Sequence, residues 1–172
     1  MPTPVPQRAQ GFAPAVTSDI RVLILGSLPG VASLAAGQYY AHPRNSFWPL
    51  MSALLDQPLV QMPYETRLKA LNAGGIGLWD VLASAERSGS LDAAIRSPEA
   101  ADLRGLIDTL PALKAVAFNG AKSAAIGRKI LKDQTDRIDF IDLPSSSPAH
   151  ARSLEDKLRH WAVLGPYLGR QG

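Results

Sequence analysis

The stretch VLILGSLPGVASLAAGQYYAHPRNSFWPLM, from Val22 to Met51, decides how the fold of this chain is interpreted. It begins with four consecutive apolar residues, which is typical of a strand buried on both faces of a parallel sheet. A Gly-Ser-Leu-Pro-Gly turn follows, and then a long loop that carries two tyrosines, His42, Arg44 and Asn45. Loops of this length in compact domains are usually functional or disordered, and the aromatic and amide side chains favour a functional loop. We therefore expect a strand that leads into a functional loop, with no helix before Ser46.

Outward from this stretch, short apolar runs alternate with helical segments. The apolar runs predict strands at residues 21–26, 75–81, 114–118 and 137–143. Helix signals predict helices at residues 47–55, 64–72, 97–110 and 121–131, and a last one that Ser153 begins. Ser46 is expected to cap the first helix, and Ser97 to cap the helix that Pro98 opens. This order predicts an α/β protein, a three-layer α/β/α arrangement around a central, mainly parallel four-stranded sheet.

The length of the chain, 172 residues, fits one domain with one sizeable core. Residues 1–17 carry several prolines and few charges. We expect them to form a flexible tail that is either disordered or laid on the surface. Residues 18–172 are expected to form a single domain.

The composition excludes several kinds of chemistry. The chain has no cysteine, which excludes disulfides, thiolate nucleophiles and cysteine-ligated zinc or iron–sulfur clusters. The formal net charge of +3 permits a polyanionic partner without requiring one. No apolar run approaches the roughly 20 residues that span a bilayer, and the start of the chain lacks a signal-peptide pattern. We therefore expect a cytoplasmic protein that does not contact a membrane.

Polar and aromatic side chains gather in the segments that follow the predicted strands, at residues 27–45, 80–90, 119–120 and 144–150. Ligands of parallel sheets bind beyond the carboxyl ends of the strands, so these segments are expected to form one site. The alternative is that strand-to-helix loops are polar in any α/β protein.

Four motifs lie in these segments in a fixed order: GSLPG with QYYAHPRNSFW, then GLWDV, VAFNGAKSA and LPSSSPAHA. In this order they resemble the uracil-DNA glycosylase superfamily, and most of all its hypoxanthine-DNA (deoxyinosine) glycosylase group. The mismatch-specific uracil/thymine glycosylases are the next most similar group. The resemblance covers nearly everything from Arg21 to the last predicted helix.

The resemblance implies a monofunctional DNA glycosylase of base excision repair. Such an enzyme rotates a deaminated base, here hypoxanthine, out of DNA and hydrolyses its N-glycosidic bond, which leaves an abasic site. The implied partner is double-stranded DNA, with single-stranded DNA left open, and the implied state is a monomer. No cofactor and no metal are expected. The motifs offer no obvious lysine nucleophile, so no Schiff base is expected.

The resemblance also implies a base pocket, in which Tyr40 takes the place of the aromatic residue that stacks on the base in the mismatch-specific relatives. Tyr39 and the Phe47-Trp48 pair are expected to pack in the core. Two interpretations stay open for His42, which either bonds the base or supports the loop, and for Asp80, which either orients the site or pairs with Arg87. The predicted pocket residues are Gly26, Ser27, Leu28, Pro29, Gly30, Tyr40, His42 and Asp80.

Asn45 is the predicted catalytic residue. The relatives place Asp, Asn or Glu just after the glycine of the first motif, but this chain has Ser27 and Leu28 there, and Leu28 cannot position water. The hypoxanthine group resembles this chain in carrying an amide in the His-Pro-Arg-Asn run. An amide is a weak base, so Asn45 is expected to position water or to bond the purine edge. The alternative is that it caps the following helix, alone or with Ser46.

The last motif resembles the intercalation loop of the superfamily, which presses on the strand as the nucleotide leaves the helix. The classical uracil enzymes have a histidine before its first proline, whereas this chain has Leu143, so uracil activity of classical strength is not expected. Ala149 and His150 lie near the wedge position, but neither is a large apolar wedge. The alternatives are a serine-rich turn before a helix and, for Asn119, a plain helix cap. The predicted DNA contacts are Asn119, Ser145, Ser146, Ser147, His150 and Arg152.

Two other functions are compatible with parts of the pattern. One is a uracil or thymine mismatch glycosylase with the same fold and a different pocket. The other is a protein without this chemistry, either a non-catalytic DNA-binding relative or a nucleotide-binding α/β enzyme. The chain lacks the glycine patterns of dinucleotide and P-loop sites, which disfavours the nucleotide-binding enzyme.

Overall fold

A four-stranded parallel sheet forms the centre of the protein. The structure, a computed structural model, describes residues 8–168. The strands lie in the order β3-β2-β6-β7. Their bounds are Val22–Gly26 for β2, Ile76–Asp80 for β3, Ala115–Asn119 for β6 and Asp139–Leu143 for β7. The predicted α/β class with a four-stranded parallel sheet is confirmed.

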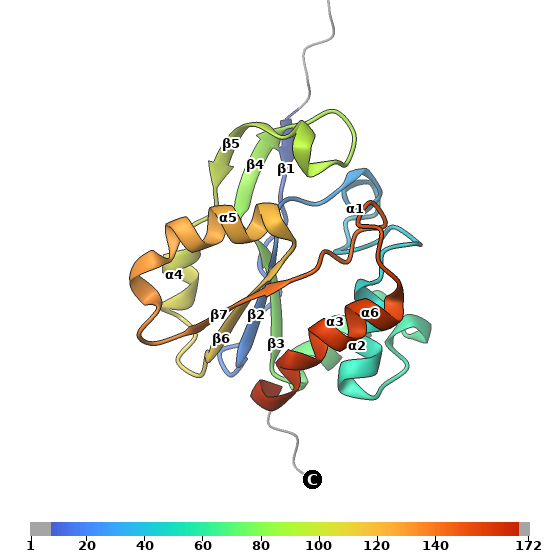
Figure 1. Ribbon diagram of the computed structural model, residues 1–172, viewed down its shortest axis with the longest axis vertical. Helices are drawn as coiled ribbons and strands as arrows, with labels where there is room; N and C mark the ends of the chain where they lie inside the picture. The colour runs from blue at the N-terminus through green and yellow to red at the C-terminus, as the bar shows by residue number, and fades with distance from the viewer. Residues whose placement is uncertain (1–7, 169–172) are drawn as a thin grey trace, which may run out of the picture.

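Helices cover both faces of this sheet (Figure 1). Helices α4 (Leu103–Ile107) and α5 (Ala121–Ile130) lie on one face. The other face carries α2 (Phe47–Leu55), α3 (Tyr64–Ala73) and α6 (Leu154–Trp161). Because both faces are covered, every residue of β2 is buried, as expected from its continuous apolar run.

Successive residues of β2 point into two different cores. Leu23 and Leu25 belong to the core that α4 and α5 close, and Val22 and Ile24 belong to the core that α2, α3 and α6 close. The second core contains a cluster of aromatic side chains that are almost completely buried: Tyr39, Phe47, Trp48 and Trp161.

A small antiparallel sheet, at the top of Figure 1, has the order β1-β4-β5. It consists of β1 (Arg8–Gln10), β4 (Leu82–Glu86) and β5 (Arg96–Ala100). One residue, Val81, separates β3 from β4. The chain therefore passes directly from the parallel sheet into the antiparallel one.

Part of the segment that we expected to be a tail is held by the domain. Arg8–Gln10 pairs with β4, and Ala15 forms a bridge with Leu78 of β3. The two backbone hydrogen bonds of this bridge are 2.9 and 3.1 Å long. Residues 1–7 of the predicted tail lie outside the described residues.

The helix predicted at residues 97–110 is wrong in its first half. Residues 96–100 are β5, which pairs with β4, and the helix α4 begins after Asp102, whose carboxylate accepts the backbone N–H of Gly105 at 3.1 Å. Ser97 adopts a left-handed backbone conformation, with φ at 48°. The Ser-Pro pair therefore bends a strand, because pairing with a distant strand outweighs the local helix signal.

Two smaller differences concern the long loop. A short helix that the sequence did not predict, α1 (Val31–Ala36), interrupts it. Ser46 stands at the N-cap position of α2, but its side chain makes no capping hydrogen bond.

The remaining helical segments are 3₁₀ turns: Leu59–Gln61 (η1), Asp92–Ala94 (η2), Lys132–Gln134 (η3) and Ala162–Leu168 (η4). Within residues 8–168, none of the helices has the length and apolar character needed to cross a membrane.

Helix α5 approaches β6 closely because Gly127 has no side chain. A Cβ at Gly127 would collide with the ring of Phe118, which is completely buried. Replacing glycine by alanine in a helix ordinarily stabilises it by about 1 kcal/mol. We predict the opposite here: Gly127→Ala should lower the free energy of unfolding by about 1 to 3 kcal/mol, as expected for overpacking. Urea denaturation measures this change.

The double mutant with Phe118→Leu provides the control. If the collision with the ring is the cause, Gly127→Ala should cost clearly less in the Phe118→Leu background. Equal costs in both backgrounds would contradict this explanation.

Candidate active site

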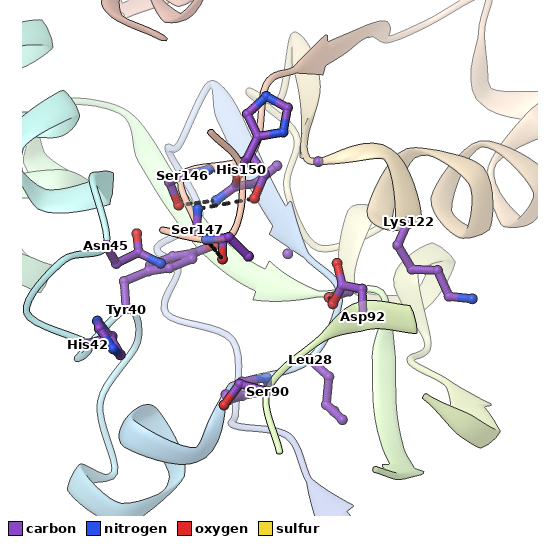
Figure 2. Close-up of a pocket in the computed structure, with 18 of the residues that line it drawn as sticks. Leu28, Tyr40, His42, Asn45, Ser90, Asp92, Lys122, Ser146, Ser147 and His150 are labelled. Atoms are coloured by element: carbon purple, nitrogen blue, oxygen red, sulfur yellow. Dashed lines mark hydrogen bonds between the residues drawn. The ribbon is translucent and has the colours of Figure 1, made fainter. Parts of the chain in front are cut away.

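The loops at the carboxyl ends of the parallel strands enclose a cleft of about 970 Å³. Its volume lies in the range of sites for small organic ligands. Figure 2 shows its walls, to which segments far apart in the sequence contribute. Every residue predicted for the pocket lines it, as do Asn45 and five of the six predicted DNA contacts: Asn119, Ser145, Ser146, Ser147 and His150.

The side chain of Tyr40 forms one wall and extends toward the floor. Its ring stacks on Phe47, with 4.0 Å between centroids and 22° between planes. The ring is partly exposed to the cleft, whereas the hydroxyl is buried and has no hydrogen-bond partner within residues 8–168. Burial, together with the charge of Asp80, raises the pKa of Tyr40 far above its ordinary value. The neighbouring Tyr39 is a core residue, as predicted, with its hydroxyl bonded to the carbonyl oxygen of Ala13 at 2.7 Å.

The backbone conformation that places the Tyr40 ring costs conformational free energy. Tyr40 has a left-handed conformation, with φ at 56°. Such a conformation costs a non-glycine residue roughly 1 kcal/mol or more. The stacking on Phe47 offsets part of that cost and holds the ring in one orientation.

Asn45 caps helix α2 and also faces the cleft (Figure 2). Its Oδ1 accepts the backbone N–H of Phe47 at 2.9 Å, so Asn45 does the capping that was expected of Ser46. An N–H donor requires the oxygen of the amide, and this fixes which end of the side chain is which. The NH₂ group is therefore the end of the amide that is available to a ligand. Both interpretations of Asn45 are compatible with this geometry, because one atom caps the helix and the other is free to act.

Asp80 lies on the floor, at the last residue of β3 and in register with Gly26 of β2. A Cβ on Gly26 would lie 2.6 Å from Oδ1 of Asp80 and 3.1 Å from the hydroxyl of Tyr40, so the glycine makes room for both oxygens. Asp80 is 4 % exposed, and its Oδ2 has no hydrogen-bond partner within the described chain. Burial raises the pKa of Asp80 to about 7, against the opposing effect of Arg87. The carboxyl group is therefore partly protonated at neutral pH.

A polar network on one side of the cleft was not predicted. Asp92 accepts the hydroxyl proton of Ser27 at 2.5 Å, and its Oδ1 lies 3.9 Å from Nη1 of Arg87. Arg87 also donates to the carbonyl oxygen of Pro29. The carboxylate that pairs with Arg87 is thus Asp92, whereas Asp80 acts on Arg87 through its charge alone. Since the hydroxyl proton of Ser27 is engaged, this side chain does not offer a donor to a ligand.

Asn119 holds the loop at residues 144–150 in place. Its Nδ2 donates to Oγ of Ser146, and its Oδ1 accepts the backbone N–H of Ser146, both at 2.9 Å. The carbonyl oxygen of Ser146 in turn accepts the backbone N–H of Ser46 at 2.9 Å. Both ends of the Asn119 amide are used within the protein, so its geometry favours positioning of the loop over a direct phosphate contact.

The remaining members of this loop are ordered by local hydrogen bonds. Oγ of Ser145 accepts the backbone N–H of Ser147, and Oγ of Ser147 accepts that of Ala149. Lys157 of α6, which is 1 % exposed, donates to the carbonyl oxygen of Ser147 at 3.2 Å. The hydroxyl protons of Ser145 and Ser147 stay available, because each oxygen acts here as an acceptor.

The two histidines of the cleft differ in their surroundings. Nδ1 of His42 accepts the backbone N–H of Arg44 at 3.1 Å, so the ring supports the loop and Nε2 is the atom that can reach a ligand. Nε2 of His150 is buried without a partner inside the described chain. Burial, with added effects of Lys157 and Arg152, lowers the pKa of His150, which favours its neutral form.

Arg152 is the predicted site residue that does not line the cleft. It pairs with Asp156 at 3.1 Å on helix α6. Conversely, the cleft contains residues that sequence reasoning missed, among them Leu91, Asp92 and Lys122. Ser90, the last residue of the segment 80–90 that was expected to contribute to the site, lines it as well. Lys122 lies within the VAFNGAKSA motif, so its place was detectable. Ser90 and Asp92 follow a strand, β4, whose existence the sequence did not reveal.

Within residues 8–168, no group of three or more His, Asp or Glu side chains is arranged to hold a metal ion. The polar groups of the cleft are amide, hydroxyl, imidazole, carboxyl, ammonium and guanidinium groups. They suit recognition of a flat heterocycle by hydrogen bonds and stacking.

Comparison with known proteins matches residues 14–165 to the model of the uracil DNA glycosylase superfamily. The chain belongs to this superfamily. The resemblance based on four motifs is thereby confirmed.

The superfamily relatives include two curated proteins described as hypoxanthine DNA glycosylase. The protein of Methanosarcina barkeri is 40 % identical, and that of Methanosarcina acetivorans 36 % identical, over 155 residues, which span 90 % of this chain and 96 % of each relative. A solution NMR structure from Methanosarcina acetivorans, of a protein provisionally described as a uracil DNA glycosylase, superposes with a TM-score of 0.85 at 34 % identity. The superposition covers 95 % of this chain and all of that one.

Because burial raises the pKa of Asp80 to about 7, its ionisation should reduce stability. The unfolded chain releases this proton near its ordinary pKa of about 4, whereas the folded protein releases it near 7, so the free energy of unfolding falls over this interval. Asp80→Asn lacks this group. We predict that the stability of Asp80→Asn relative to wild type increases between about pH 4 and pH 7, by at most roughly 4 kcal/mol, and is constant above.

Urea denaturation of both proteins across this pH range tests the prediction. The other ionisable groups are common to both proteins and cancel in the difference. A difference that does not vary with pH would show that Asp80 ionises at its ordinary pKa.

Proposed function

We propose that this protein is a monofunctional DNA glycosylase that removes hypoxanthine from DNA by hydrolysing the N-glycosidic bond. The observation that carries the proposal is the cleft itself: in a member of this superfamily, it joins an aromatic wall to the free NH₂ group of Asn45. The similarity to two proteins described as hypoxanthine DNA glycosylase, over nearly their whole length, supports the choice of base.

Entry of the base into the cleft requires that it leave the stack of the duplex. The exposed part of the Tyr40 ring offers a surface on which it can stack, a contact worth roughly 1 to 3 kcal/mol in other base-binding sites. A base stacked along this ring would direct one edge toward the floor, where the Tyr40 hydroxyl and Asp80 lie. The protonated carboxyl of Asp80 can donate to a carbonyl oxygen and accept from an adjacent N–H, a combination that hypoxanthine presents.

Hydrolysis breaks the bond between C1′ and the base nitrogen, and the electron pair leaves with the base. The sugar acquires oxocarbenium character, the oxygen of water bonds to C1′, and the departing base takes up the proton that the water releases, so that it leaves in neutral form. Asn45 assists by donating from its NH₂ group to the departing base, because fixed donors stabilise the negative charge that develops there. A hydrogen bond from the same group to the water oxygen would only position the water, since that oxygen becomes more positive as it bonds to C1′. With Oδ1 engaged by the helix cap, Asn45 acts as a donor and not as the acceptor of that proton.

The rim of the cleft supplies groups for the DNA backbone. Lys122 and Arg44 add positive charge, and the hydroxyl groups of Ser145 and Ser147 are available to phosphate oxygens. Arg152 lies outside the cleft and can contact the flanking backbone. We propose double-stranded DNA as the substrate and a monomer as the active form, acting in the cytoplasm where it has access to the chromosome.

Asn45 provides the first test of the mechanism. Asn45→Asp keeps an oxygen that can cap α2 but lacks the donor, whereas Asn45→Ala lacks both groups. We predict that each variant slows single-turnover base release from an inosine duplex by about 100-fold or more, as when one transition-state donor is removed elsewhere. Asn45→Ala should in addition lose about 1 kcal/mol of stability, and Asn45→Asp less.

Duplex binding serves as the control and should change little in Asn45→Ala, because the phosphate contacts remain. Normal base release by Asn45→Ala would show that another residue provides the catalytic hydrogen-bond donor. Full activity of Asn45→Asp would show that the helix cap, not the donor, is what matters.

The preferred base is tested with a panel of oligonucleotides that contain inosine, xanthine, uracil, a thymine mismatch or ethenocytosine. We expect the fastest release from inosine, with strand breaks that appear after alkali treatment reveals the abasic sites. Faster release of uracil or thymine would favour the mismatch glycosylase alternative. Binding of every duplex without release of any base would favour a non-catalytic relative. Breaks without alkali would contradict the monofunctional reaction and point to Lys122 as a nucleophile.

A further inference from the structure

Arg87 is a buried cation beside the cleft. It comes directly after β4, and its side chain is 1 % exposed. Its Nη2 donates to the carbonyl oxygen of Pro29, whereas its Nε and Nη1 have no hydrogen-bond partner within the described chain. The carboxylate of Asp92 lies 3.9 Å from Nη1, which makes an ion pair without a hydrogen bond. Burial of a charge with so few hydrogen bonds costs folding free energy.

Packing does not account for a charged side chain at this position. Apolar residues of similar volume often replace buried ion pairs without loss of stability, and in some proteins with a gain. Asp92 does not require Arg87 as a partner, because its side chain is 45 % exposed and can be hydrated. The charge of Arg87 therefore points to a role in the site, and the group on which it acts has to be buried and ionisable.

Asp80 on the floor of the cleft is such a group. It is almost completely buried, and its Oδ2 has no hydrogen-bond partner among residues 8–168. Burial raises the pKa of Asp80, the charge of Arg87 lowers it, and the charge of Asp92 raises it. The hydroxyls of Tyr39 and Tyr40 also face Asp80, but they stay neutral, because burial raises the pKa of both. Arg87 is therefore the cation that opposes the effect of burial at the floor.

We propose that Arg87 is a positioning residue of this enzyme: it holds the turn at residues 27–30 through the carbonyl oxygen of Pro29, and its charge acts through Asp80 on the hydrogen bond that the floor offers to the base. The proposal rests on the proposed glycosylase function, in which the protonated carboxyl of Asp80 donates to the carbonyl oxygen of hypoxanthine. An ionised carboxylate has no proton to donate and repels that oxygen. Arg87 therefore sets the pH above which the floor no longer recognises the base.

The variants Arg87→Gln and Arg87→Lys separate the charge from the hydrogen bond. Gln keeps a donor for the carbonyl oxygen of Pro29 but lacks the charge, whereas Lys keeps the charge without the planar fork of donors.

Single-turnover base release from an inosine duplex is measured across the neutral pH range. In wild type the rate should fall as the pH rises through the pKa of Asp80. In Arg87→Gln this fall should lie about one pH unit or more higher, because burial is then unopposed. In Arg87→Lys it should lie within about half a unit of wild type. His42 and His150 are present in every variant, so their titration cancels in the comparison.

Stability reports on the same charge without any need for catalysis. The stability of Asp80→Asn relative to the protein that keeps Asp80 increases with pH until the folded protein has released the proton of Asp80. In the Arg87→Gln background this increase should continue about one pH unit or more beyond the pH at which it ends in the wild-type background. In the Arg87→Lys background it should end within about half a unit of wild type. Urea denaturation of the single and double variants measures these intervals, and a merely structural role of Arg87 would not move them.

The role of Arg87 is overturned by any of three results. Wild-type pH dependence of both readouts in Arg87→Gln would show that the charge does not act on Asp80. Equal shifts in Arg87→Lys and Arg87→Gln would show that the charge is not the cause. A shift in the stability interval without a shift in the rate would show that Asp80 does not donate to the base. Failure of the proposed function is distinct, because wild type would then release no hypoxanthine at any pH, while the stability interval would still report on Arg87.

Discussion

The parallel register of the four central strands is the constraint on which the rest of the structure depends. Because β2, β3, β6 and β7 run in the same direction, their carboxyl ends meet at one edge of the sheet, and the loops that follow them meet there too. The pairing of Gly26 with Asp80 is the central instance. A glycine without a side chain lies beside a buried carboxyl, and the space it leaves is shared with the hydroxyl of Tyr40. A shift of one residue between β2 and β3 would turn Asp80 to the opposite face of the sheet and remove it from the floor.

The sequence was sufficient for the elements whose signals are local. The buried strands have continuous apolar runs, and the cap of α6 at Ser153 follows the expected pattern, with its hydroxyl oxygen accepting the N–H of Asp156 at 3.1 Å. It was insufficient for β1, β4 and β5, which are short strands that mix apolar, polar and charged residues. Their conformation depends on partners far away along the chain, as the pairing of Arg8 with Glu86 illustrates. The Ser97-Pro98 pair has the same local chemistry in a bent strand as at the start of a helix, so local reasoning could not distinguish the two.

For the cleft, the sequence indicated which chemical groups are present but not which of them are already engaged. Asn45 and Asn119 carry the same amide, yet one offers a free NH₂ group and the other is bonded to Ser146 through both its nitrogen and its oxygen. Ser27 belongs to the first motif, but its hydroxyl donates a hydrogen bond to Asp92, and no local sequence pattern connects these two residues. Whether a side-chain group is available to a ligand depends on the hydrogen bonds that it makes in the folded protein. Leu91 and Asp92, which sequence reasoning missed, come shortly after β4, a strand that was also missed.

The hydrogen bond from Ser46 to Ser146 links the two halves of the cleft through the backbone. Ser46 is the residue next to Asn45, and Ser146 sits in the middle of the loop that is expected to hold the phosphates. A displacement of that loop would therefore act on the backbone directly beside Asn45. The order of the 144–150 loop and the orientation of the Asn45 amide are therefore coupled, and a substitution that disturbs the first can disturb the second.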